Sequence, residues 1–191
     1  MDGPESFRTE SRRQAPARPV ELWCEDEARL GLKPVARRVW ALEGHRPTSC
    51  GRQRFESLYV SGFARPATGR SLCLFLPKAN AELMGEALAA FARWADPAGE
   101  KVLVVLVDNA GGHVAKALKV PANVRLYPLP PCTPELQPAE HLWPLVREAP
   151  ANRTFDHLVG LAAKRRRRCD GLAEHPEVVK GAVGFHGAVN L

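Results

Sequence analysis

The chain has 191 residues, a formal net charge of +6, and a composition that is 45% hydrophobic and 25% charged. This composition excludes a disordered or fibrous chain, and the length favours one domain with a sizeable core. We expect neither a secretory signal nor a membrane span, because no apolar run has the necessary length or position. The basic excess suits a polyanionic partner such as DNA.

The cysteines are scattered along the chain, and no two of them have a CxxC spacing. Their odd number argues against a complete disulfide framework, and their spacing argues against structural zinc. We therefore expect free thiols in a cytoplasmic protein. The cysteines are Cys24, Cys50, Cys73, Cys132 and Cys169.

The first residues predict a flexible arm followed by a single domain. Residues 1–18 are polar and rich in Arg and Pro, so we expect a flexible basic arm there and the domain at 19–191. A disordered leader is the simpler interpretation of the arm. Contact of the arm with DNA phosphates is the alternative.

The first part of the domain predicts extended structure. Residues 20–32 predict a strand, and residues 37–44 predict a second extended segment. Residues 56–64 and 70–76 predict the two arms of a hairpin, with the turn at 66–69.

A helix should follow, because the apolar period then changes to three and four residues. Asn80 predicts its N-cap, and Asp96, Pro97 and Gly99 predict its end. The residues that carry the helical period are Leu83, Met84, Ala87, Leu88, Phe91 and Trp94.

The second half of the chain alternates strand and helix. The apolar run at 102–107 predicts a central strand buried on both faces. A short helix is expected at 112–119, a parallel strand at 123–127, a helix from about Pro138, and a last helix at 154–169. The order predicts an α/β, ribonuclease-H-like fold. Its mixed five-stranded sheet would be antiparallel in the first three strands, then parallel, and flanked by helices.

Three acidic residues stand where such a fold would use them. Asp26 lies in the first strand, Asp108 follows the central strand, and Glu140 lies in the first turn of a helix. Clustered carboxylates repel one another unless they bind hard cations such as Mg²⁺ or Mn²⁺. Two such ions about 4 Å apart can promote an in-line phosphoryl displacement on DNA.

Three segments resemble the bacterial insertion-sequence branch of the mariner-type DDE transposases. The first is DEARLGL at 26–32 followed by RRVWALEGHRP at 37–47, and the second is VLVVLVDNAGGH at 102–113. The third and most specific is YPLPPCTPELQPAEHLW at 127–143. The resemblance covers about residues 20–190, in order.

The resemblance implies an enzyme that cleaves DNA strands and transfers them during transposition of an insertion sequence. It implies that Asp26, Asp108 and Glu140 are the catalytic residues and the ligands of two Mg²⁺ or Mn²⁺ ions. The implied partner is double-stranded DNA, as element ends and as target, and a homodimer is implied by analogy. The expected location is the bacterial cytoplasm, in association with the nucleoid.

The sequence departs from the family pattern in three respects. The family carries helix-turn-helix segments before its catalytic domain, so a separate helix-turn-helix chain is a further expected partner. Gln137 stands where the family has Asn. Pro144 cannot donate to the carbonyl of Glu140, which predicts a kink in the helix that carries Glu140.

Some neighbouring acids are rival ligands. Glu25 and Glu27 flank Asp26. Because successive side chains of a strand point to opposite faces of the sheet, either Asp26 or the two glutamates can face the site, but not all three. Glu135 is a rival to Glu140. We favour Asp26 and Glu140, largely on the resemblance.

Basic residues in two clusters could contact DNA phosphates. The run at 164–168 cannot all face one groove, because consecutive residues spread around a helix, and a solvated face is the alternative. Trp40 is expected in the core. His113 is expected either at a phosphate or near the metal ions, and exposure to solvent at a helix start is the alternative. The candidate DNA contacts are Arg37, Arg38, Arg52, Arg54, His113, Lys164, Arg165 and Arg166.

Two other functions fit the same sequence. One is a catalytically decayed or repurposed DNA-binding remnant of a transposase. The other is a different ribonuclease-H-like nuclease, such as one that acts on RNA–DNA hybrids or junctions.

Overall fold

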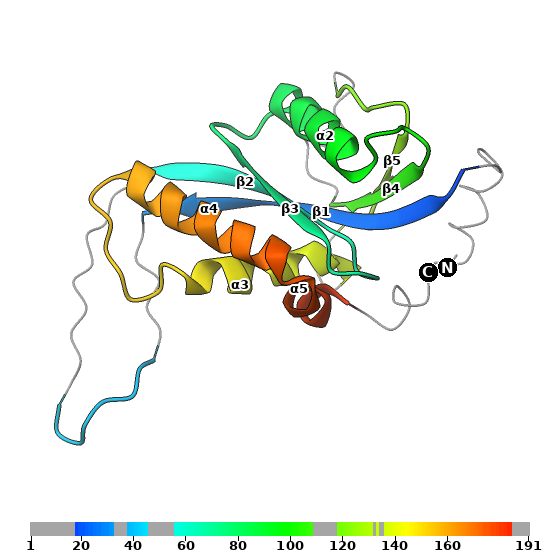
Figure 1. Cartoon of the computed structure of the whole chain (residues 1–191). Helices are drawn as coiled ribbons and strands as arrows, with labels where there is room; N and C mark the ends of the chain where they lie inside the picture. Colours follow the sequence, from blue (N-terminus) through cyan, green and yellow to red (C-terminus); the bar gives the residue numbers. More distant parts are fainter. Residues whose placement is uncertain are drawn as a thin grey trace.

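The protein contains one mixed five-stranded sheet, in the order β3-β2-β1-β4-β5 (Figure 1). Strand β1 pairs antiparallel with β2, which pairs antiparallel with β3, while β1 pairs parallel with β4 and β4 with β5. This topology confirms the predicted fold class. The strands are β1 (Val20–Gly31), β2 (Ser57–Ala64), β3 (Ser71–Leu76), β4 (Val102–Val107) and β5 (Val124–Pro128).

These elements come from a computed structural model. It describes residues 18–32, 38–45, 56–108, 118–131, 133 and 136–184. No helix among these residues has the length and apolar character to cross a membrane.

Strand β4 is the centre of the parallel half of the sheet. All six of its residues are buried. The continuous apolar run is explained by this position, since β4 lies between β1 and β5 and both of its faces are covered. The predictions for β1, the β2–β3 hairpin and β4 are confirmed to within a few residues.

Helix α2 (Ala81–Ala95) covers one face of the sheet (Figure 1). Its predicted cap is present, because the Asn80 side chain accepts a 2.8 Å hydrogen bond from the Leu83 N–H. The core beneath it is aromatic: the Phe63 and Phe91 rings stack with their centroids 4.3 Å apart, and Trp23 meets Phe91 edge to face.

The opposite face is covered by four helical segments (Figure 1). They are η2 (Pro138–His141), α3 (Leu142–Glu148), α4 (Leu158–Glu174) and α5 (Pro176–Val183). The helices expected from about Pro138 and over 154–169 are confirmed, although α4 begins and ends later than predicted. Helix α5 was not predicted. It begins at Pro176, a residue suited to a first helical turn.

Residues 38–45 correct two expectations. They contain no strand, and they lie away from the sheet (Figure 1). The indole of Trp40 is fully exposed, so its expected place in the core is wrong. The expected helix at 112–119 lies outside the described residues, except for residues 118 and 119, which are not helical.

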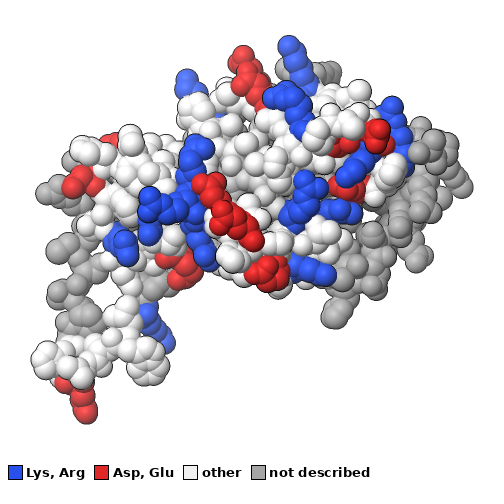
Figure 2. All heavy atoms as spheres, viewed as in Figure 1, with Lys and Arg blue, Asp and Glu red and all other residues white. Residues whose placement is uncertain are grey.

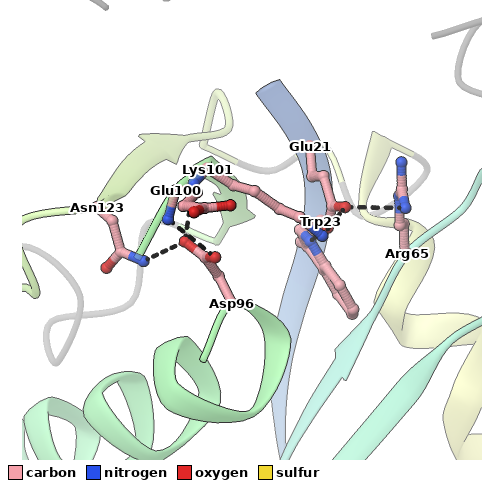
Figure 3. Close-up of polar contacts among 7 residues, drawn as sticks. All are labelled: Glu21, Trp23, Arg65, Asp96, Glu100, Lys101 and Asn123. Carbon is pink, nitrogen blue, oxygen red and sulfur yellow. Dashed lines mark hydrogen bonds and ion pairs between the residues drawn. The ribbon is translucent and has the colours of Figure 1, made fainter. Parts of the chain in front are cut away.

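A polar cluster fixes the amino-terminal ends of β1 and β4 (Figure 3). The buried carboxylate of Asp96 accepts hydrogen bonds from the backbone N–H groups of Glu100 and Lys101, at 3.1 and 2.9 Å, and from Asn123 at 3.0 Å. Burial acts to raise the pKa of Asp96, but these hydrogen bonds outweigh it and hold the pKa below its usual value.

Glu21 completes this cluster from β1 (Figure 3). Its carboxylate accepts hydrogen bonds from Arg65 at 3.1 Å and from the Lys101 ammonium at 2.8 Å. The indole N–H of Trp23 donates to its other oxygen at 3.1 Å. The buried charge is therefore paired, and this end of the strands is structural.

Candidate active site

Asp26 and Asp108 come together where the parallel pairing of β1 with β4 ends. The register pairs Cys24 with Leu106, and each aspartate stands two residues further along the chain, Asp26 within β1 and Asp108 directly after β4. Both side chains are half-buried, and the charge of Asp108 acts on Asp26. Ligands of open α/β sheets bind at this end of the strands.

The β1 parity distinguishes Asp26 from its neighbours. Asp26 lies on the same face as Cys24 and Ala28, which pack under the segment η2–α3. Glu25 lies on the face covered by α2, fully buried, where the Ser61 hydroxyl donates to it at 2.7 Å. Glu27 shares the parity of Glu25. Of the three acids, Asp26 alone faces the element that carries Glu140.

Two side chains attach this element to β1, one on each side of Glu140. The amide Nε2 of Gln137 donates to the backbone carbonyl of Glu25 at 2.9 Å, and Gln137 is 2% exposed. The indole N–H of Trp143 donates to Oδ2 of Asp26 at 2.6 Å. Glu140 lies midway between them in η2, with its side chain exposed.

The structure accommodates two of the departures from the family pattern, those at Gln137 and Pro144. Gln137 caps η2, where its side chain accepts from the Ala139 N–H while its amide holds β1. Pro144 does not kink an α-helix that carries Glu140, because the chain changes from 3-10 to α-helix at Leu142. Pro144 then falls in the first turn of α3, where a backbone N–H has no intrahelical partner to lose.

The surroundings of Asp26 disfavour its negative charge. Burial raises the pKa of Asp26 to about 6, and repulsion from Glu25 and Asp108 adds to the effect, although the hydrogen bond from Trp143 opposes it. A divalent cation between Asp26 and Asp108 would relieve this repulsion. Carboxylate oxygens are also the ligands that Mg²⁺ and Mn²⁺ prefer, so the two aspartates fit such an ion.

The Glu140 side chain does not lie close enough to Asp26 and Asp108 to complete a three-residue metal site. Within the described part of the chain, no group of three His, Cys, Asp or Glu side chains is close enough to hold a metal ion. The structure therefore pairs Asp26 with Asp108 and places Glu140 on the segment beside them. Its rival Glu135 lies outside the described residues.

The basic run on α4 divides between surface and interior, as helix geometry predicts. Arg166 and Arg167 are exposed and Lys164 is half-buried. Arg165 is 2% exposed, so it does not belong to the solvated face, and burial together with Arg147 lowers its pKa to about 10. Figure 2 shows Lys and Arg side chains gathered over α4, with acidic side chains beside them.

Of the remaining candidate DNA contacts, the structure describes only Arg38. Arg38 is exposed, in the segment that lies away from the sheet. Arg37, Arg52, Arg54 and His113 lie outside the described residues. Of the cysteines, Cys24, Cys73 and Cys169 are free thiols, as expected.

Sequence reasoning missed the contacts of Gln137 and Trp143 with β1. Trp143 is 5% exposed and lies in the core, where its indole N–H donates to Asp26. The available signal was spacing. Gln137 and Trp143 each lie three residues from Glu140, and residues three apart lie on one side of a helix.

Comparison with solved structures supports the fold. The chain is similar to the Mos1 transposase in its paired-end complex with the left transposon end, with a TM-score of 0.56 and 18% identity. That match covers 94% of this chain and 60% of the other. The Mos1 mariner paired-end complex with Mn gives a TM-score of 0.56 at 19% identity, covering 95% and 60% of the two chains.

One curated relative matches part of the sequence. This is the uncharacterized protein y4pE/y4sA of Sinorhizobium fredii (strain NBRC 101917 / NGR234), which is 41% identical over 90 residues. The match covers 47% of this chain and 65% of the relative. The chain thus spans less than two thirds of the length of each of these relatives.

A sequence model of the DDE superfamily endonucleases matches residues 21–161. This range runs from β1 through η2 and α3 into α4, and it includes Asp26, Asp108 and Glu140. The matched family, the sheet order and the structural similarity to Mos1 agree. The chain belongs to the DDE superfamily endonuclease family.

Proposed function

We propose that this chain is the catalytic domain of an insertion-sequence transposase, which cleaves DNA strands and transfers them to a target with the aid of two divalent metal ions. The observation that carries the proposal is the meeting of Asp26, within β1, and Asp108, directly after β4, beside a segment that carries Glu140. Solved relatives with the same fold include Mos1 complexes with a transposon end, with Mn and with Mg.

Asp26, Asp108 and Glu140 would hold the metal ions, Mg²⁺ or Mn²⁺. When bound, such ions activate the attacking water or 3′-hydroxyl and stabilise the leaving oxygen of a phosphodiester. The carboxylate of Asp26 is mostly ionised at neutral pH, because its pKa of about 6 lies below that pH. Glu140 supplies the third carboxylate from η2, a segment held to β1 by hydrogen bonds.

The proposed partner is double-stranded DNA. Exposed Arg166 and Arg167 on α4 supply positive charge that suits phosphates. A separate helix-turn-helix chain would supply recognition of the element ends. A homodimer would bring two ends together, and the protein would act on the bacterial nucleoid in the cytoplasm.

Nicking of supercoiled plasmid DNA tests the proposal. The purified protein should convert supercoiled to open circular DNA in Mn²⁺ but not in EDTA, and Asp108→Ala should abolish the conversion. Glu86→Ala is the matched control, because Glu86 is an exposed acid on α2, on the other face of the sheet. Equal nicking by wild type and Asp108→Ala would refute the assignment of Asp108.

Two other results would redirect the proposal. Binding of DNA without metal-dependent nicking would favour a decayed DNA-binding remnant. Preferential cleavage of RNA–DNA hybrids or junctions in competition with duplex DNA would favour a different ribonuclease-H-like nuclease.

A further inference from the structure

Trp143 joins the segment that carries Glu140 to Asp26. Its ring is 5% exposed on the η2–α3 face of the sheet, and its N–H points along that face to Oδ2 of Asp26 at 2.6 Å. The two residues are 117 positions apart in the sequence. A 2.6 Å distance is short for an N–H···O hydrogen bond, and an ionised acceptor shortens such bonds.

Gly62 makes room for this arrangement. It is the β2 partner of Asp26 in the register. A Cβ at Gly62 would lie 2.8 Å from Cη2 of the Trp143 ring and 3.3 Å from Cδ1 of Leu142. The ring is therefore seated against the bare backbone of β2, beside Asp26. Any larger residue at position 62 would displace the indole ring from this position.

The choice of donor has a chemical consequence. An Arg or Lys at this place would also orient the carboxylate, but its positive charge would cancel the charge that attracts a cation. Indole is a neutral donor with a single N–H and no acceptor. It can hold one oxygen of Asp26 in place while the carboxylate keeps its full negative charge.

We infer that Trp143 is a positioning residue for Asp26: its indole N–H holds Oδ2, so that Oδ1 is the oxygen presented to a divalent metal ion. Seated over Gly62, the same ring joins the segment that carries Glu140 to the strand that carries Asp26. This inference rests on the proposed function, since it assigns the metal ion to Asp26. Residues that orient metal ligands typically change metal affinity by about 10–100-fold when they are altered.

The first test needs no metal ion. In a ¹H–¹⁵N spectrum of the full chain in EDTA, the indole signal lost in Trp143→Phe identifies Trp143 among the four tryptophans. That signal should lie downfield, as a hydrogen-bonded N–H does, and should move upfield in Asp26→Ala. The other three indole signals should stay in place, which shows that the variant is folded. An unchanged Trp143 signal would overturn the inference.

The second test measures the affinity for Mn²⁺ by electron paramagnetic resonance of the free ion. Trp143→Phe, which keeps an aromatic ring but removes the donor, should weaken binding by at least about 10-fold. Incorporation of benzothienylalanine at position 143 should weaken Mn²⁺ binding to a similar degree. This residue has the shape of tryptophan with sulfur in place of the N–H. Trp94→Phe on α2 is the matched control and should bind as the wild type does.

The outcomes separate the inference from the proposed function. Wild-type affinity in the benzothienylalanine protein would overturn the inference while leaving the metal site intact. Failure of the wild-type protein to bind Mn²⁺ would overturn the proposed function and the metal-facing part of the inference. In that case the spectrum in EDTA would still decide whether the hydrogen bond exists.

Discussion

At the scale of single residues, Asp26 is a charged group in a place that disfavours charge. It is half-buried, it lies near Asp108 and Glu25, and its pKa is raised to about 6. The hydrogen bond from Trp143 offsets only part of the free-energy cost of ionising Asp26 there. Groups with perturbed pKa values cluster at functional sites, where the arrangement that the chemistry requires lowers folding stability.

Replacement of Asp26 by Asn should therefore stabilise the metal-free protein. The folded-state pKa of about 6 lies above the ordinary value of 3.8, so ionisation of Asp26 costs folding stability as the pH rises through this window. At pH 7.5 in EDTA we expect Asp26→Asn to raise the free energy of unfolding by up to about 3 kcal/mol, because each pKa unit between 3.8 and about 6 corresponds to about 1.4 kcal/mol. Urea unfolding at pH 7.5 and at pH 4 measures it.

The pH dependence is the diagnostic part of this prediction. The difference in the free energy of unfolding between Asp26→Asn and wild type should disappear towards pH 4, where Asp26 is protonated in the folded protein. Glu86→Gln, an exposed substitution on α2, should have little effect at either pH. A loss of stability in Asp26→Asn at pH 7.5, or a gain that is independent of pH, would contradict this account of the site.

At the scale of elements, the contact of β2 with α3 depends on the absence of a side chain at Gly62. Gly62→Ala would place a methyl group 2.8 Å from the Trp143 ring, so the ring must move. Overpacking of this kind costs about 1–3 kcal/mol. We expect a lower melting temperature for Gly62→Ala and a weaker Asp26–Trp143 hydrogen bond.

Gly171→Ala is the control for this prediction. Gly171 lies within α4, and a Cβ there would meet no atom within 4 Å. Alanine should stabilise the helix by up to about 1 kcal/mol relative to glycine. An unchanged or raised melting temperature in Gly62→Ala would refute the close approach of Trp143 to Gly62.

Local patterns predicted most of the elements, and the misses have physical causes. The apolar run of β4 and the cap at Asn80 are local signals, and both correspond to observed elements. Residues 38–45 carry a strand-like pattern, but a strand also needs a neighbour for its backbone groups, and periodicity does not reveal one. Helix α5 has eight residues, too few for a clear period.

The candidate site was predictable in part for similar reasons. The position of Asp108 follows from the end of an apolar strand, and strand alternation limits the choice between Asp26 and its neighbours. The bond between Asp26 and Trp143 spans 117 positions, and no local pattern encodes it. The separation of Glu140 from the aspartate pair is likewise a property of packing rather than of spacing.

At the scale of the whole molecule, the two ends of the parallel strands have different roles. The amino-terminal ends are fixed by the paired charges around Glu21 and Asp96 (Figure 3). The other end of the β1–β4 pairing carries Asp26 and Asp108, whose charges repel. On one flanking face, α4 carries a basic surface (Figure 2).

This basic surface predicts a change in DNA affinity. The double substitution Arg166→Glu and Arg167→Glu should weaken binding to duplex DNA and make the slope of log K against log salt concentration shallower by about 2. Arg93→Glu, an exposed change on α2, should leave both quantities near wild type. Fluorescence anisotropy with a labelled duplex measures them. Equal slopes for all three proteins would exclude α4 from the DNA interface.

The most direct test of the central claim is titration calorimetry of the whole chain with Mn²⁺, using wild type and single substitutions of the three proposed ligands. We expect the wild type to bind Mn²⁺, and Asp26→Asn, Asp108→Asn and Glu140→Gln each to lose binding or lower its stoichiometry. Glu135→Gln should bind as the wild type does. Undiminished binding in Asp108→Asn, or loss in Glu135→Gln with retention in Glu140→Gln, would contradict the account.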